Sequence, residues 1–187
     1  MRKLFSFSKK EVFDLIKAYA AITLAFAALF TKGSLNVVEA FAISAIAVGA
    51  GFIVHELAHK FMAQHYNCKA EFRSDDKMLV LAVLLAIFTS FIIAAPGAVM
   101  ISNVSKKREY GIISAVGPAS NLVLALLFFL LPFGKLSAYG FYINSMLALF
   151  NMIPAGNFDG KKVLGWNKSV FGVLMGLSVI FFLIAIL

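Results

Sequence analysis

Long uninterrupted apolar stretches constrain this chain more than any other feature of its sequence. A helix needs roughly 20 consecutive apolar residues to cross the hydrocarbon core of a bilayer. Stretches that meet or approach this length lie at about 12–30, 37–63, 78–101, 110–131, 138–153 and 169–187. Apolar residues make up 61% of the 187 residues and charged residues 14%. Soluble domains are about half apolar and a quarter charged. A chain of this size cannot bury such an excess in its own core, so the sequence predicts that its solvent is lipid.

The positive charge of the chain is gathered in short segments between these stretches. The formal net charge is +8, and Lys and Arg occur in connecting segments such as 102–109 and 159–168. Basic residues in such loops fix the orientation of a membrane protein and meet anionic head groups. We therefore expect membrane lipid, and no nucleic acid, among its partners. The basic N-terminus runs directly into the first stretch, which predicts an anchor and not a removed signal peptide. The single cysteine, Cys68, has no second thiol for an intramolecular disulfide or a thiolate metal site.

Polar residues at membrane depth are costly, so they tend to mark functional sites. Those within or beside the apolar stretches are Glu39, His55, Glu56, His59, Asn121, Asn144, Asn151 and Asp159.

One short motif in the second stretch, His55-Glu56-Leu57-Ala58-His59, has the pattern H-E-x-x-H. Residues four apart on a helix lie on one face, so the two histidines can offer imidazole nitrogens to one metal ion. Glu56 stands beside them and can take the proton of a zinc-activated water, the arrangement expected of a metalloprotease. In soluble helices this pattern often arises by chance. Inside an apolar stretch these groups are expensive to bury without a metal, which favours a metal site.

Two residues compete as the third protein ligand that a catalytic zinc usually has. His65 stands at the spacing of the longer motif H-E-x-x-H-x-x-G-x-x-H, but Met62 occupies the place of the glycine that turns the chain. On a continued helix, His65 also lies about 9 Å along the axis from His59. Asp159 follows a segment with proline and glycine that would break a helix and let a carboxylate turn inward. Spacing alone does not distinguish this ligand role from that of a capping residue in an interfacial turn.

Three motifs together resemble the site-2 protease family of intramembrane zinc metalloproteases. They are H-E-x-x-H at 55–59, Gly117-Pro118-Ala119-Ser120-Asn121, and N-x-x-P-x-x-x-x-D-G at 151–160. The motifs occur in the family's order and cover the catalytic core, about 37–165. The chain looks like a compact prokaryotic member without PDZ or CBS domains.

This resemblance implies Zn²⁺ as the cofactor and His55, His59 and Asp159 as its ligands, with Glu56 as the general base. It further implies that Asn151 is a catalytic and substrate-binding residue, because an amide can donate to the substrate carbonyl or its developing oxyanion. Asn121 is expected to be a supporting residue that packs and hydrogen-bonds near the site.

The predicted metal site also constrains the topology. His55 and His59 lie toward the end of the second stretch and Asp159 just past the fifth, so all three must reach the same side. A single crossing by 78–101 would separate them. We therefore expect a re-entrant hairpin or an embedded strand segment near 78–101, which is allowed where protein or water covers the backbone. Candidate bends are Thr89-Ser90 and Pro96-Gly97. An embedded strand would offer an edge to an extended substrate backbone.

The sequence thus predicts one integral-membrane domain over 1–187, an all-α polytopic fold with about five to six transmembrane helices. The predicted function is regulated intramembrane proteolysis: hydrolysis of peptide bonds in transmembrane protein substrates. The predicted location is the cell membrane, multi-pass, with the active site near the cytoplasmic face, where the positive-inside rule places most of the basic segments. Two other classes stay open: a zinc-binding membrane protein without catalysis (a pseudoprotease) and a metal or proton transporter. The intact Glu56 disfavours the first, and the clustering of polar residues at one depth disfavours the second.

Overall fold

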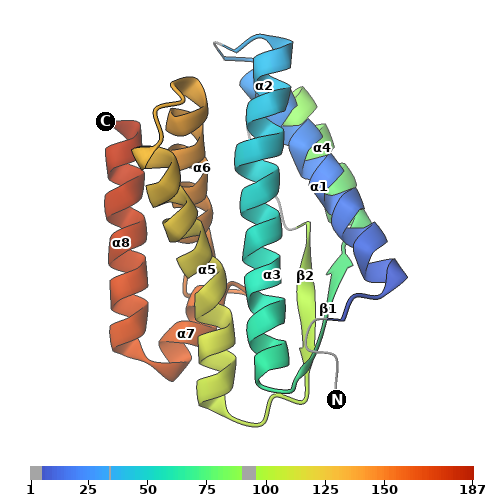
Figure 1. Cartoon of the computed structure of the whole chain (residues 1–187), viewed down its shortest axis with the longest axis vertical. Coiled ribbons are helices and arrows are strands. Elements are labelled where there is room, and N and C mark those ends of the chain that lie inside the picture. The colour runs from blue at the N-terminus through green and yellow to red at the C-terminus, as the bar shows by residue number, and fades with distance from the viewer. Residues whose placement is uncertain (1–5, 34, 90–95) are drawn as a thin grey trace.

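The computed structural model describes residues 6–33, 35–89 and 96–187, and it is mostly helical (Figure 1). Its elements are α1 (Lys9–Phe30), α2 (Val37–Ile43), the π-helical turn η1 (Ser44–Gly49), α3 (Ala50–His65), β1 (Lys69–Ser74), α4 (Asp76–Phe88), β2 (Gly97–Ser102), α5 (Lys107–Leu130), α6 (Lys135–Asn151), α7 (Asp159–Trp166) and α8 (Lys168–Ile186). α2, η1 and α3 follow one another without a break and form one long rod. In Figure 1 this rod stands at the centre, with α1, α4 and the two strands on one side and α5 to α8 on the other.

Four helices are long and apolar enough to cross a membrane. They are Lys9–Phe30, Val37–His65, Lys107–Leu130 and Lys168–Ile186. These helices match the first, second, fourth and sixth apolar stretches of the sequence. The fifth stretch forms α6, which has 17 residues. A helix of that length rises about 26 Å, somewhat less than a hydrocarbon core of about 30 Å. The helical fold class is therefore confirmed, and the total of five to six transmembrane helices stays a prediction.

The third stretch, 78–101, is divided between a helix and a strand. Its first part belongs to α4, which is capped by Thr89, and its last part belongs to β2. Ser90, part of one predicted bend, lies outside the described residues. At the other predicted bend Gly97 has φ of 150°, and an added Cβ there would lie 2.2 Å from the carbonyl oxygen of Arg73.

The two strands that flank α4 form a small antiparallel sheet. Their register runs from Lys69 opposite Ser102 to Ser74 opposite Gly97. The chain therefore leaves this sheet through β1 and returns to it through β2. The strand segment expected near 78–101 is present, and its re-entrant position in a membrane stays a prediction.

The π-helical turn lies just before the metal-binding motif in the rod. Wide turns of this kind disturb the regular backbone hydrogen bonding of a helix. Side chains from two other helices bond to its carbonyls: Tyr19 Oη of α1 donates to Ala45 O at 3.2 Å, and Asn144 Nδ2 of α6 donates to Ala47 O at 3.3 Å. An added Cβ at Gly49 would lie 2.3 Å from the Tyr19 ring, so only glycine allows this approach. Contacts from α1 and α6 thus hold the turn that precedes His55 in the chain.

The main hydrophobic core lies between α1 and the rod, with Phe72 of β1, Leu79 of α4 and Ile143 of α6 packed into it. α8 packs against α6 and α7 at the edge of the molecule, and Ser178 is its only buried residue. The exposed apolar side chains of α8 suit a helix that faces lipid.

Candidate metal centre

The two histidines of the motif lie on one face of α3 with their rings together. His55 Nε2 and His59 Nε2 are 3.0 Å apart, and the ring centroids are 4.6 Å apart. Both residues are buried. The i and i+4 positions of one helix bring the two nitrogens together, as the spacing predicts.

A carboxylate from a distant part of the chain completes the cluster. Asp159 Oδ2 lies 3.0 Å from His59 Nε2 and 3.4 Å from His55 Nε2. The ligand atoms of the three buried residues all lie within 4.8 Å of one another. This is the only such group of His, Cys, Asp or Glu in the described part of the chain.

The turn between α6 and α7 brings Asp159 to this place. α6 ends at Asn151, and the chain then turns through Gly156, which has φ of 52° and so adopts a left-handed conformation that favours glycine. Asp159 is the first residue of α7. The next residue, Gly160, packs directly on Met152: an added Cβ would lie 2.0 Å from the Met152 carbonyl oxygen. A larger residue at position 160 would move Asp159 away from the histidines.

Hydrogen bonds at the far side of each imidazole orient the two rings. His59 Nδ1 lies 2.6 Å from the Ile113 carbonyl oxygen, and His55 Nδ1 lies 2.6 Å from Asn121 Oδ1. Asn121 Nδ2 donates to Gly51 O at 3.2 Å, which fixes which end of the amide faces His55. A neutral imidazole that donates from Nδ1 keeps its lone pair on Nε2, the atom that faces the cluster. The arrangement is that of paired metal ligands with orienting partners.

The network behind His55 reaches a second buried asparagine. Asn121 Nδ2 also donates to Asn144 Oδ1 at 3.1 Å, and Asn144 Nδ2 donates to Gly140 O at 3.0 Å. Asn121 and Asn144 are fully buried. Because buried amides are costly without partners, this satisfied network holds α3, α5 and α6 in one arrangement around His55.

A glycine of α5 leaves the space in front of the imidazole nitrogens. An added Cβ at Gly117 would lie 2.3 Å from His59 Nε2 and 2.7 Å from His55 Nε2. The helix backbone can therefore approach the cluster, while no side chain at this position fills the space beside the nitrogens.

The donor set fits zinc. Two imidazole nitrogens and one carboxylate oxygen are a common ligand set of catalytic zinc sites. Burial raises the pKa of the Asp159 carboxyl, but its close contacts with His59 and His55 outweigh burial and lower the pKa overall. Lys162 Nζ contacts the other carboxylate oxygen, Oδ1, at 3.1 Å. Asp159 is thus available as an ionised ligand.

Glu56 lies beside the cluster and contacts the sheet. Its side chain is buried, and its Oε2 accepts a hydrogen bond from the Val99 N–H of β2 at 3.1 Å. β2 therefore runs next to the residue that the sequence predicts as the general base.

Asn151 and His65, two further residues singled out in the sequence, have contacts of their own. Asn151 Nδ2 donates to Leu147 O of its own helix at 3.0 Å, so its predicted role toward the substrate stays a prediction. His65 is exposed at the end of α3, and its ring packs on Tyr66 with centroids 5.4 Å apart. It does not belong to the cluster.

Several contributors were not assigned a role by sequence reasoning. The Ile113 carbonyl is a backbone group and leaves no signal in a sequence. Asn144 stood out as polar in an apolar stretch, but nothing in the sequence indicated its partner. Lys60 lies in the second stretch, follows His59 directly and is buried. Its burial could have been suspected from this position alone.

Comparison with known proteins adds an independent finding. A protein of Methanocaldococcus jannaschii that is named a putative zinc metalloprotease is 38% identical to this chain in an alignment of 180 residues, which covers 91% of this chain and 92% of that protein. The chain belongs to the same family as that protein. No family model matches the chain, and no solved structure matches it. The name of the relative agrees with the His55, His59 and Asp159 cluster as a possible zinc site.

Proposed function

We propose that this protein is an intramembrane zinc metalloprotease of the site-2 protease type, which hydrolyses peptide bonds in transmembrane protein substrates. The observation that carries the proposal is the convergence of His55, His59 and Asp159, with Glu56 beside them, inside a helical bundle with apolar helices long enough to span a membrane. The archaeal relative named a zinc metalloprotease supports the same chemistry.

In this proposal His55, His59 and Asp159 hold the zinc ion. The chemistry that zinc supplies when bound is polarisation of a carbonyl and activation of water near neutral pH. Asn121 and the Ile113 carbonyl keep the two imidazoles oriented through their Nδ1 atoms. The protein thereby offers a rigid ligand set in a site shielded from lipid.

Glu56 is the general base of the proposed reaction. Hydrolysis consumes one water, whose oxygen bonds to the substrate carbonyl carbon while one proton passes to the Glu56 carboxylate. The carbon–nitrogen bond then breaks, and the departing amine receives the proton from Glu56. Asn151 Nδ2 donates one of its two N–H groups to the Leu147 carbonyl, so the second N–H is the one that could bond to the developing oxyanion.

β2 provides the edge on which we propose that the substrate backbone is placed. Phe72 and Val99 are opposite each other in the sheet, and each donates its N–H to a glutamate outside it: Phe72 to Glu11 and Val99 to Glu56. Neither N–H therefore takes part in the hydrogen bonds between β1 and β2. At every second residue of β2, the backbone N–H and C=O point away from β1 toward the edge near Glu56. A substrate strand that pairs there takes the Val99 N–H and leaves Glu56 Oε2 free to accept a proton.

The proposed location is the cell membrane, with the metal centre near the cytoplasmic face. Lys162 of α7 lies 5.8 Å from the ring centroid of Tyr110 near the start of α5, so the basic segments at 106–108 and 161–162 share the end of the bundle that holds the metal centre. At the start of α6, Lys135 pairs with Glu39 of α2 at 3.0 Å. Under the positive-inside rule the end with more basic residues is cytoplasmic.

The experiment that tests the proposal compares the wild type with Glu56→Gln on a single-span membrane substrate in proteoliposomes. Loss of a general base lowers the rate by about 10²–10⁴-fold, and zinc content should be unchanged because Glu56 is not a ligand. Wild-type cleavage that Glu56→Gln abolishes supports a protease. Zinc binding without any cleavage supports a pseudoprotease, and metal-dependent flux across the vesicle membrane supports a transporter.

A further inference from the structure

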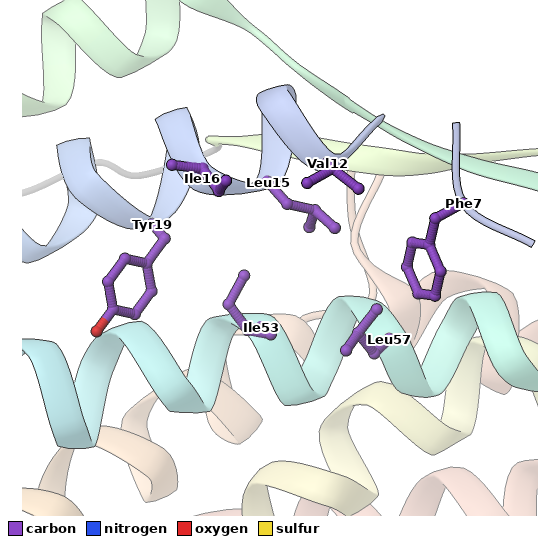
Figure 2. Close-up of a pocket in the computed structure, with 7 residues that line it drawn as sticks. All are labelled: Phe7, Val12, Leu15, Ile16, Tyr19, Ile53 and Leu57. Atoms are coloured by element: carbon purple, nitrogen blue, oxygen red, sulfur yellow. The ribbon is translucent and has the colours of Figure 1, made fainter. Parts of the chain in front are cut away.

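A buried ion pair lies beside the metal-binding face of α3 and includes Lys60, the residue that follows His59. Lys60 Nζ contacts both carboxylate oxygens of Glu11 in α1, at 2.6 and 2.7 Å. The exposed fractions of Lys60 and Glu11 are 1% and 0%. Phe7 covers the ammonium group, with its ring centroid 4.3 Å from Nζ. Figure 2 shows Phe7 at one end of an apolar groove between α1 and α3.

Stability alone is a weak explanation for such a pair. Desolvation of two charges consumes much of the attraction between them, and hydrophobic replacements of a buried pair are often neutral or stabilising. Neither residue contacts the metal cluster through a hydrogen bond or ion pair.

Both members of the pair bond to β1. Glu11 Oε1 accepts the Phe72 N–H at 2.9 Å, and Lys60 Nζ contacts the Ala70 carbonyl oxygen at 3.3 Å. Phe72 is the register partner of Val99, whose own N–H is bonded to Glu56. The two outward amides of one register pair thus end on two carboxylates, Glu11 at the β1 edge and Glu56 at the β2 edge.

Glu56 and Lys60 are four residues apart, so they lie on the same face of α3. This face contacts both edges of the sheet: Glu56 bonds to β2, and Lys60 bonds to β1 directly and through Glu11 of α1. We propose that Lys60 and Glu11 are positioning residues that set the place of β2 relative to Glu56 and the metal centre. This inference rests on the proposed function, because the edge of β2 is where we place the substrate backbone.

The test compares two double variants that both lack the ion pair. In Glu11→Gln/Lys60→Met the Gln oxygen still accepts the Phe72 N–H, and its amide can donate to the Ala70 carbonyl that Lys60 served. In Glu11→Met/Lys60→Met the volume is similar, but no acceptor is left for Phe72. Because both variants lack the charges, a difference between them reports the hydrogen bond from the Phe72 N–H to residue 11.

Two readouts are measured for each variant. One is kcat and KM for the single-span substrate, together with zinc content. The other is the distance between spin labels at Met100 of β2 and Val123 of α5, both exposed, in a Cys68→Ser background. The second readout does not depend on activity. If the wild type cleaves nothing, the proposed function fails, and the label distance still tests the positioning role.

We expect Glu11→Gln/Lys60→Met to keep the wild-type label distance and activity. Glu11→Met/Lys60→Met should bind zinc normally, shift or broaden the distance, and lose at least about ten-fold in kcat/KM, since a misplacement of about 1 Å can cost roughly 10²-fold. Equal distances and equal kcat/KM in the two double variants would overturn the proposal.

A milder variant covers the case in which the Met pair does not fold. Glu11→Asp keeps the negative charge beside Lys60 but shortens the reach to Phe72. It should show the shifted label distance and the lower kcat/KM with unchanged zinc content. If Glu11→Asp matches the wild type in both measurements, the proposal is wrong.

Discussion

Gly117 is the residue that most directly controls the space at the candidate metal centre. Its missing side chain lets α5 pass beside the Nε2 atoms of both histidines. We expect Gly117→Ala to prevent the ligand geometry, because the new methyl group would meet His59 Nε2 at 2.3 Å. Overpacking of this kind also costs about 1–3 kcal/mol of stability. Zinc content of the purified variant is the measurement.

Gly172→Ala is the matched control for this change. An added Cβ at Gly172 in α8 meets nothing within 4 Å. This variant should keep its zinc and its thermal stability. Full zinc content in Gly117→Ala would show that the histidines do not hold the metal in the arrangement described here.

Asn121 controls the orientation of His55. We expect Asn121→Ala to weaken zinc affinity about 10–100-fold, the usual effect of losing a group that orients a metal ligand. Competition with a chelator measures the affinity. Ser120→Ala is a suitable control, because the Ser120 hydroxyl donates only to Gly117 O of its own helix. Equal affinities in the two variants would exclude an orienting role for Asn121.

At the scale of single residues, the sequence predicted the candidate ligands better than the groups that hydrogen-bond to them. The spacing of His55 and His59 was enough to place them on one face, since local helix geometry determines it. Asp159 came from a motif resemblance, because no local geometry relates it to position 59. The Ile113 carbonyl could not be predicted, since every residue has one. The pairing of Lys60 with Glu11 spans 49 positions and depends on how α1 packs on α3.

Among the elements, α4 and the two strands decide the topology of the chain. The antiparallel pairing of β1 with β2 returns the chain to its starting point after α4. That return is what lets the start of α5 lie beside α7 near the metal centre. The orientation of the helices in the membrane can therefore be tested from the ends of α5, α6 and α7.

We expect cysteines introduced at Lys107 and Lys161 to react only from the cytoplasmic side, and one at Lys135 only from the outside. The background is Cys68→Ser. Lys107 and Lys161 stand on α5 and α7 at the metal-centre end, and all three side chains are exposed. Labelling with an impermeant maleimide in intact cells and in inverted vesicles gives the sides. Labelling of Lys107 and Lys161 from the outside would contradict the topology proposed for 78–101.

The sequence predicted the long helices well and the short elements less well. Apolar length is a strong signal, and it marked the four helices that are long enough to span a membrane. For 78–101, the requirement that Asp159 meet the histidines predicted only a re-entrant hairpin or an embedded strand segment, and the helix α4 in its first part was not predicted. The π-helical turn gave no signal, because Tyr19 and Asn144, which bond to two of its carbonyls, come from other helices.

At the scale of the whole molecule, the candidate metal centre is buried inside the bundle, and the exposed outer surface is largely apolar. α8 and the outer faces of α1 and α5 expose apolar side chains, while the polar network of Asn121 and Asn144 is fully buried behind His55. The small sheet with β2 lies on the side of α3 that carries Glu56. α3 thus carries two candidate ligands and the predicted base, while α7 carries the third candidate ligand and β2 the strand edge.

The central claim is that one metal is held by two residues of α3 and one residue of α7. Zinc content of purified Asp159→Ala and His65→Ala, measured beside the wild type, tests it most directly. We predict about one zinc ion per chain in the wild type and in His65→Ala, and a large loss in Asp159→Ala, which keeps only two protein ligands. Loss of zinc in His65→Ala with full zinc in Asp159→Ala would contradict the account.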